Sequence, residues 1–173
     1  VERIEAEGGI VYAKSNTPEF GAGGNTFNNV FGNTLNPWDL RMSTAGSSGG
    51  AAAALASGMA WLAHGSDMGG SLRNPASFCG VVGMRPSPGR IAQGPGLLPF
   101  NSLGVQGPMA RNVADLALFF DVMTGEDYRD PLSFPKSEIS FLEAVKSSQK
   151  PAKIAFSADF GFMTVDPEVT EIC

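Results

Sequence analysis

The sequence predicts an α/β layered fold, because short apolar segments typical of buried strands alternate along the chain with segments of helical periodicity. Hydrophobic residues make up 43% of the 173 residues and charged residues 17%, a composition typical of a globular protein. The apolar-rich stretch over residues 51–63 is too short and too rich in alanine to span a bilayer, so no membrane span is expected. No internal repeat and no linker divides the chain.

In the first half of the chain, residues 1–8 have the pattern of a helix end closed by glycine. Residues 10–13 predict a short buried strand, and a polar, asparagine-rich loop follows over residues 14–44. An alanine-rich helix is expected over residues 49–57, where small side chains allow close packing. The segment 59–63 then predicts a strand that leads into a glycine-rich turn.

The second half contains the clearest helix signal, which begins at Asn112 and stops before Gly125. Its apolar face consists of Val113, Leu116, Ala117, Phe120 and Met123. A weaker helix is expected over residues 140–147 and a strand over residues 152–157, after the break at Pro151. Asp166, followed by proline and an acidic residue, indicates the start of a further helix.

Two serine–glycine clusters carry the functional signal: Ser47-Ser48-Gly49-Gly50 and Gly69-Gly70-Ser71. Glycine lets the backbone approach a ligand closely, because no Cβ atom blocks the approach. Backbone N–H groups that converge on one point are what a developing oxyanion requires. Either cluster alone would equally well mark a turn or a flexible loop. Together they indicate a nucleophile site that is built from backbone.

The residues around both clusters resemble the two halves of the amidase signature. The halves read AGSSGGAAA over residues 45–53 and GSDMGGSLRNPASFCG over residues 65–80. Further similarity lies at residues 14–20, 33–38, 83–87 and 107–111. One departure is Ala45, where many members of the family have glycine. The resemblance covers most of residues 10–125 and implies a mixed β-sheet flanked by helices on both faces.

The resemblance also implies roles for the serines. Ser71 falls on the family's acyl-accepting nucleophile, and Ser47 falls on its bridging serine, which is held by a cis peptide. The third member of the family's triad is a lysine that typically lies much farther upstream than the 33 residues between Lys14 and Ser47. Lys14 is therefore a poor candidate, and we expect the catalytic lysine to be absent from this chain.

In the mechanism that the resemblance implies, a neutral lysine acts through Ser47, which takes the proton of Ser71 and later gives one to the departing amine. Serine is a weak nucleophile at neutral pH and needs such a base. The N–H groups of Met68, Gly69, Gly70 and Ser71 would hold the tetrahedral oxyanion. A neutral lysine requires desolvation, which predicts a buried site reached through a pocket. No cofactor is required.

Neighbouring residues have predicted supporting roles. Ser48 either supports the proton relay by hydrogen bonding or caps the following helix. An ion pair between Asp67 and Arg73 would hold the shape of the nucleophile turn. Cys79 lies in an apolar segment and is expected to be buried and inert, and His64 is expected to be a buried structural imidazole.

Several other classes of function fit the sequence poorly. The net charge is -5 and the 12 lysines and arginines are scattered, which argues against a broad nucleic-acid surface. One histidine and two cysteines provide neither metal-ligand spacing nor a Ser-His-Asp relay within the chain. Neither glycine cluster has the spacing of a phosphate-binding loop. Two cysteines give no disulfide framework, so a cytoplasmic location is expected.

The sequence therefore predicts an amidase that hydrolyses the C–N bond of a linear, small-molecule carboxylic amide through a seryl acyl-enzyme. Two alternatives stay open. One is the glutamine-hydrolysing A subunit of a tRNA-dependent amidotransferase, with tRNA and partner subunits, and the other is a non-catalytic fragment that keeps the fold. Residues 1–173 are expected to be part of a single amidase domain, truncated at both ends and inactive alone. A homodimer is one assembly considered for the whole protein.

Overall fold

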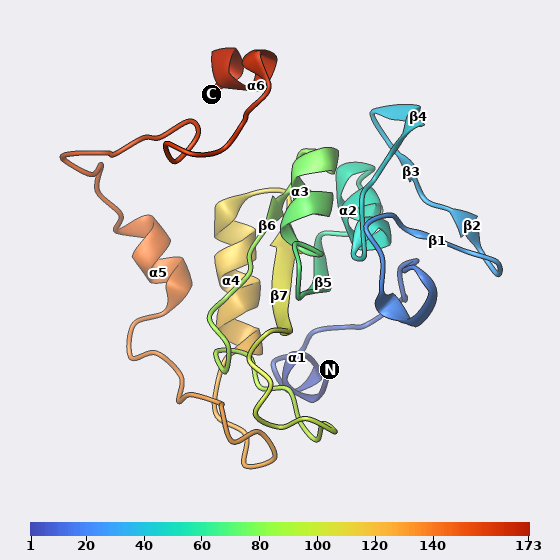
Figure 1. Ribbon diagram of the computed structural model, residues 1–173. Helices are drawn as coiled ribbons and strands as arrows, with labels where there is room; N and C mark the ends of the chain where they lie inside the picture. Colours follow the sequence, from blue (N-terminus) through green and yellow to red (C-terminus); the bar gives the residue numbers. More distant parts are fainter.

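A three-stranded antiparallel sheet, with strand order β5-β7-β6, lies at the centre of the fold (Figure 1). The strands are β5 (Leu62–Asp67), β6 (Val82–Gly83) and β7 (Val105–Ala110). The computed structural model describes all residues from 1 to 173. Parallel pairing occurs only in an isolated bridge between Ile91 and Gly125.

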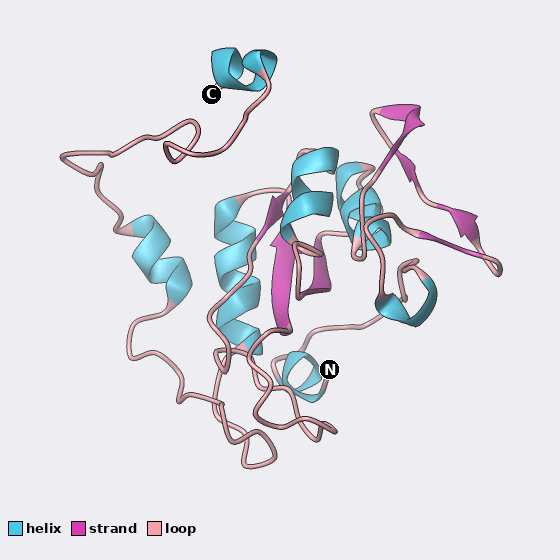
Figure 2. Ribbon diagram, viewed as in Figure 1, coloured by secondary structure: helices cyan, strands magenta, loops and turns pink.

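Helices cover both faces of this sheet (Figure 2). They are α2 (Gly49–Ala56) and α3 (Arg73–Cys79) on one face and α4 (Val113–Met123) on the other. Met109 of β7 belongs to the core with α2 and α3, whereas Leu62 of β5 packs against the core of α4. These opposite directions follow from the alternation of side chains along a strand. The predicted α/β class, with helices on both faces, is confirmed.

The core has two parts, one for each face. The first contains Ala51, Ala52, Leu55, Ala60, Leu72, Ala76, Cys79 and Met109. The second contains Ile91, Phe119, Phe120 and Met123. Alanines dominate the first part because α2 packs closely against its neighbours, as the sequence predicts. Cys79 is fully buried, as expected, and burial raises the pKa of its thiol, which favours the unreactive protonated form.

The segment that the sequence predicts as one polar loop contains two short hairpins beside the main body (Figure 1). Their strands are β1 (Phe27–Asn28), β2 (Gly32–Asn33), β3 (Leu35–Asn36) and β4 (Asp39–Ser43). Trp38, at the tip of the second hairpin, donates a hydrogen bond from its indole Nε1 to the carbonyl of Cys79, at 2.7 Å. This bond ties the second hairpin to the end of α3.

The predicted outer helices near residues 1–8, 140–147 and 166 are present, and a 3-10 turn that the sequence does not predict lies among them. They are α1 (Glu2–Ala6), α5 (Phe141–Lys146) and α6 (Pro167–Ile172), together with the 3-10 turn η1 (Glu19–Gly21). Asn112 caps α4 by accepting a hydrogen bond from the N–H of Asp115, and Ser140 and Asp166 cap α5 and α6 in the same way. Phe141 of α5 packs against Phe120 of α4, whereas α6 lies away from the sheet (Figure 1).

Two predicted strands are wrong and one is displaced. Residues 10–13 and 152–157 are exposed and irregular, because no neighbouring segment offers them a ladder of hydrogen bonds. The strand predicted at 59–63 begins instead at Leu62, because the chain leaves α2 through a turn in which Gly58 has a φ of +75°. His64 lies within this strand and is exposed, not buried as expected. No helix of the structure has the length and apolar character needed to cross a membrane.

Candidate active site

The two predicted serine turns lie side by side. Ser47 precedes α2, and Ser71 lies between β5 and α3. The backbone N–H of Ser48 donates to the carbonyl oxygen of Ser71 at 3.2 Å, which joins the turns directly. The peptide bond between Gly46 and Ser47 is cis, the geometry that the resemblance implies at this position. Ser47 is 3% exposed and Ser71 is partly exposed, and neither hydroxyl makes a hydrogen bond within the chain.

Asp67, the last residue of β5, organises the turn that carries Ser71. Its carboxylate accepts backbone hydrogen bonds from Gly70 at 2.9 Å and from Leu72 at 3.2 Å. It also accepts hydrogen bonds from Nε and Nη2 of Arg73, at 2.9 and 3.0 Å, in a bidentate ion pair. The expected ion pair between Asp67 and Arg73 is thus present, and it encloses the nucleophile turn.

A second arginine, Arg85, reaches the same carboxylate. Its Nη1 lies 3.1 Å from Oδ1 of Asp67 and also donates to the Asp67 carbonyl, and its Nη2 donates to the carbonyl of Leu103 at 2.8 Å. Burial alone would raise the pKa of Asp67, but hydrogen bonds from Arg73 and from the backbone outweigh it and hold that pKa well below its ordinary value. Asp67 is therefore a fixed negative charge within the turn.

The backbone of this turn requires glycine at one position. Gly70 has a φ of +115°, and a Cβ atom there would lie 2.6 Å from the side-chain nitrogen Nδ2 of Asn74. The Gly70 N–H, one of the predicted oxyanion donors, instead donates its hydrogen bond to the carboxylate of Asp67. The other predicted donors are the N–H groups of Met68, Gly69 and Ser71. These three N–H groups are unpaired within the chain.

The turn that carries Ser47 rests on two buried threonines. The hydroxyl of Thr26 accepts a hydrogen bond from the N–H of Gly49 at 3.1 Å and donates to the carbonyl of Ala45 at 2.9 Å. The hydroxyl of Thr44 also donates to Ala45. A Cβ atom at Gly49 would lie 2.3 Å from the Thr26 hydroxyl, so only glycine lets the start of α2 approach this closely.

Ser48 connects the first turn to β5. Its hydroxyl accepts from the N–H of Ser66 at 3.3 Å and donates to the carbonyl of the same residue at 3.4 Å, and it makes no capping bond to α2. A Cβ atom at Gly65 would lie 2.7 Å from the Ser48 hydroxyl, so glycine provides the space for this contact. The predicted capping bond is therefore absent, and the Ser48 hydroxyl instead holds the first turn against β5.

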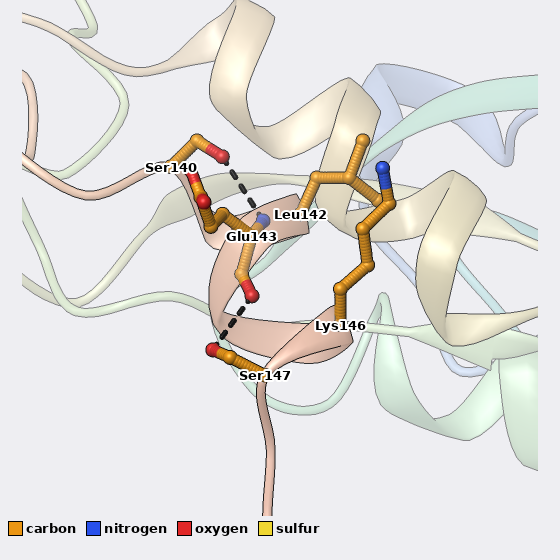
Figure 3. Close-up of a pocket in the computed structure, with 5 residues that line it drawn as sticks. All are labelled: Ser140, Leu142, Glu143, Lys146 and Ser147. Carbon is orange, nitrogen blue, oxygen red and sulfur yellow. Dashed lines mark hydrogen bonds between the residues drawn. The ribbon is translucent and has the colours of Figure 1, made fainter.

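A cavity of about 500 Å³ opens beside Met68, between the nucleophile turn and the segment 88–104. A second hollow, of about 350 Å³, lies on α5 and is lined by Ser140, Leu142, Glu143, Lys146 and Ser147 (Figure 3). In that hollow, the Ser140 and Ser147 hydroxyls bond to the backbone of Glu143, as the dashed lines show. Neither Ser47 nor Ser71 lines either cavity, and only the cavity beside Met68 touches the turn that carries Ser71.

No lysine of the chain makes a hydrogen bond to the hydroxyl of Ser47 or Ser71. All five lysines are exposed, and none bonds to a serine hydroxyl: Lys14, Lys136, Lys146, Lys150 and Lys153. Sequence reasoning missed Thr26, Thr44 and Arg85 as parts of the site. Arg85 lies 18 residues from Asp67, and no local periodicity links the two. Its only sequence signal is its place in the Gly83–Ser87 segment of the resemblance.

The fold and site define an α/β protein that presents two serines on adjoining, glycine-shaped backbone turns. The Amidase family model matches residues 1–173, so the chain belongs to the amidase signature family. The chain is 46% identical over 173 residues to an acylamidase of Rhodococcus erythropolis, covering 100% of this chain and 36% of that protein. It is 42% identical over 173 residues to the A subunit of glutamyl-tRNA(Gln) amidotransferase from Sulfurihydrogenibium, covering 99% of this chain and 36% of that protein.

Among solved structures, the chain resembles 6-aminohexanoate cyclic dimer hydrolase complexed with substrate. The TM-score is 0.80 at 38% identity, with 86% of this chain and 31% of that chain covered. The chain thus spans about a third of the length of the relatives it matches.

Proposed function

We propose that the full-length protein hydrolyses carboxylic amides through an acyl-enzyme on Ser71. The observation that carries this proposal is the junction of the two serine turns, where the Ser48 N–H donates to the Ser71 carbonyl. The hydroxyls of Ser47 and Ser71 are both uncommitted there, beside three backbone N–H groups without acceptors. The acylamidase and the cyclic dimer hydrolase among the similar proteins support amide hydrolysis as the reaction class.

In this proposal, Ser71 Oγ attacks the amide carbonyl carbon while its proton passes to Ser47. Ser47 in turn passes a proton to a neutral lysine from outside this chain. Collapse of the tetrahedral intermediate breaks the C–N bond, and the departing nitrogen takes its proton back through Ser47. Water then attacks the Ser71 ester by the same proton route and releases the acid, so the enzyme returns to its starting state.

The oxyanion that forms during both attacks is held by the N–H groups of Met68, Gly69 and Ser71. In comparable sites, each such donor stabilises the transition state by about 3 kcal/mol. Gly70 does not donate to the oxyanion, because its N–H is bonded to Asp67. Its backbone conformation shapes the turn instead. Asp67, Arg73 and Ser48 position this backbone and do not touch the reacting atoms.

The second candidate is a glutamine-hydrolysing component of a tRNA-dependent amidotransferase. It is favoured by the 42% identity to the A subunit of glutamyl-tRNA(Gln) amidotransferase. The chemistry at Ser71 would be the same, with glutamine as the amide and ammonia as the product. Partner subunits and tRNA belong to this candidate alone. A cytoplasmic location fits both, because Cys79 and Cys173 are free thiols.

The test is substitution of the serines in the full-length protein, assayed by release of amine or ammonia from simple amides. Ser71→Ala is expected to abolish turnover, and Ser47→Ala to leave a small residual activity, because water can partly replace the bridge. Ser77→Ala is the matched control, since Ser77 is exposed on α3 and its hydroxyl makes no hydrogen bond. Wild-type activity in Ser71→Ala would overturn the proposal.

A further inference from the structure

The antiparallel pairing of β5 with β7 stops just before the nucleophile turn, at Asp67. In the same register, the next residue, Met68, lies opposite Gly104. The two chains are still close at this position, because a Cβ atom at Gly104 would lie 3.7 Å from Cε of Met68. Gly69 then falls opposite Leu103, but the two residues share no hydrogen bond. The strands therefore part at Gly69, whose N–H is one of the proposed oxyanion donors.

The backbone of β7 shows which groups one further pair would join. Successive residues of a strand direct their N–H and C=O groups alternately toward the two neighbouring strands. The carbonyl of Pro108 accepts from the N–H of Met84, on the β6 side, at 3.2 Å. Leu103 lies an odd number of residues before Pro108, so its carbonyl faces the β5 side in the same pattern. One more pair would therefore place the Gly69 N–H on the Leu103 carbonyl.

Side chains already occupy both backbone groups of Leu103. Nη2 of Arg85 donates to its carbonyl at 2.8 Å, and Oδ1 of Asn101 accepts from its N–H at 2.9 Å. Gly69 is exposed, and its N–H has no acceptor within the chain. The next position of the ladder is thus closed from the β7 side.

Arg85 is held at this point by the end of β5. Its Nη1 donates to the backbone carbonyl of Asp67 and lies 3.1 Å from Oδ1 of the same residue. One guanidinium group thus spans a carbonyl of each chain at the place where the two chains part. The fixed fork of N–H donors on arginine allows both bonds at once. Its side chain is only 24% exposed.

We propose that Arg85 is a positioning residue that ends the β5–β7 ladder before Gly69 and so keeps the Gly69 N–H unpaired for the oxyanion. This role rests on the function proposed above. Without Arg85, the carbonyl of Leu103 loses its donor, and the Gly69 N–H is the backbone donor that the register places opposite it. Pairing of Gly69 with Leu103 would then remove one donor from the oxyanion site. Arg85 acts through the backbone and touches no reacting atom.

The kinetic test is Arg85→Met in the full-length protein, which removes every N–H donor of the side chain. We expect kcat for amide hydrolysis to fall by about 100-fold, the effect of losing one oxyanion donor. KM should stay within about twofold, because the full negative charge develops only in the transition state. Arg90→Met is the matched control and should preserve both constants. The Arg90 guanidinium lies over the ring of Phe134 and makes no hydrogen bond.

Amide hydrogen exchange at Gly69, resolved to single residues by electron-transfer fragmentation, separates this role from simple neutralisation of Asp67. In Arg85→Met, pairing with Leu103 should slow exchange at Gly69 by about tenfold, the protection that one ordinary hydrogen bond provides. Loss of an ion pair alone would loosen the turn and leave exchange unchanged or faster. Arg73→Met provides that comparison, because it removes the other arginine bound to Asp67 and leaves the bond from Arg85 to Leu103 intact. It should not slow exchange at Gly69.

The wild-type protein gives a measurement that does not depend on the folding of Arg85→Met. Without ligand, the Gly69 amide should exchange as fast as an unbonded amide, and slow exchange there would overturn the inference.

The outcomes also separate this inference from the proposed function. Unchanged kcat in Arg85→Met, exchange at Gly69 that is not slowed in that variant, or equal slowing in Arg73→Met would each overturn the inference while Ser71-dependent hydrolysis stands. Absence of any Ser71-dependent amide hydrolysis in wild type would instead overturn the proposed function. The exchange measurements would still decide whether Arg85 ends the ladder.

Discussion

At the scale of single residues, the carboxylate of Asp67 holds the turn that carries Ser71. Asp67 is 1% exposed and binds two arginines and three backbone N–H groups of its own turn. A buried carboxylate is tolerated only when it is bonded in this way. Because its partners flank Ser71, the position of the proposed nucleophile is set by the ionised form of Asp67.

This charge predicts a pH dependence of stability. The pKa of Asp67 is lower in the folded state than its unfolded value of about 3.9. Its contribution to stability is therefore fully present above about pH 4 and is lost as the pH falls toward the folded-state pKa. We expect Asp67→Asn to lower the free energy of unfolding of the full-length protein by roughly 2 kcal/mol at pH 7, measured by urea unfolding.

The same variant should also lose less stability than wild type between pH 7 and pH 3. Glu171→Gln is the control, because Glu171 is exposed and makes no side-chain hydrogen bond. Identical losses of stability in wild type and Asp67→Asn over this pH range would show that Asp67 does not carry the acid sensitivity.

The neighbouring glycines Gly69 and Gly70 should differ in how well they tolerate a side chain. Gly70→Ala places a Cβ atom at a φ of +115° and 2.6 Å from Asn74, whereas a Cβ at Gly69 meets nothing within 4 Å. We expect Gly70→Ala to destabilise the full-length protein by more than about 1 kcal/mol and Gly69→Ala to have a smaller effect. Thermal unfolding of the two variants measures the difference, and equal midpoints would contradict it.

The roles of these residues differ in how far the sequence could predict them. Ser47, Ser71 and the Asp67–Arg73 pair lie within two short motifs, so local spacing and the family resemblance locate them. Arg85 reaches Asp67 only because β5 and the segment after β6 are brought together by the fold. The loss of the Gly70 N–H to Asp67 is likewise not predictable from the motif, since it depends on the direction in which the turn closes.

At the scale of elements, the helices are more predictable than the strands, for a physical reason. A helix such as α4 is specified by its own cap and apolar stripe, from Asn112 to Met123. A strand needs a partner, and the apolar segments 10–13 and 152–157 have none in this chain. The displacement of β5 to Leu62–Asp67 follows from its pairing with β7, which its own sequence does not encode.

The position of α2 yields a prediction at this scale. The buried Thr26 hydroxyl is the acceptor for the Gly49 N–H, at 3.1 Å, so it fixes the start of the helix that follows Ser47. Thr26→Val keeps the shape and removes the hydroxyl, which leaves buried backbone groups unpaired. We expect a loss of about 1–3 kcal/mol in the free energy of unfolding, together with lower activity of the full-length protein. Urea unfolding and an amide hydrolysis assay measure the two effects.

Thr26→Ser is the matched variant, because it keeps the hydroxyl and removes only a methyl group. It should retain most of the activity that Thr26→Val loses. If both variants lose activity equally, packing of the methyl group, not the hydrogen bond, positions the start of α2.

At the scale of the whole molecule, the chain holds two of the three groups that the proposed mechanism requires. Both serines are present, and a backbone hydrogen bond joins the turns that carry them, but every lysine is exposed. A lysine that acts as a base must be neutral, and only desolvated surroundings favour the neutral form. The chain spans about a third of its relatives' length, so we predict that the base is contributed by a residue of the full-length protein outside residues 1–173.

Reaction with a sulfonyl fluoride serine probe, followed by intact mass and peptide mapping, tests this division. We expect a covalent adduct on Ser71 in the full-length protein and none on the folded 173-residue chain, because an unassisted serine hydroxyl is a poor nucleophile. Ser71→Ala in the full-length protein is the control for the site of reaction. An adduct on the isolated chain that is lost in Lys14→Met would contradict the prediction and make Lys14 the base. An adduct that survives this substitution would show that Ser71 reacts without Lys14 and would equally contradict the prediction.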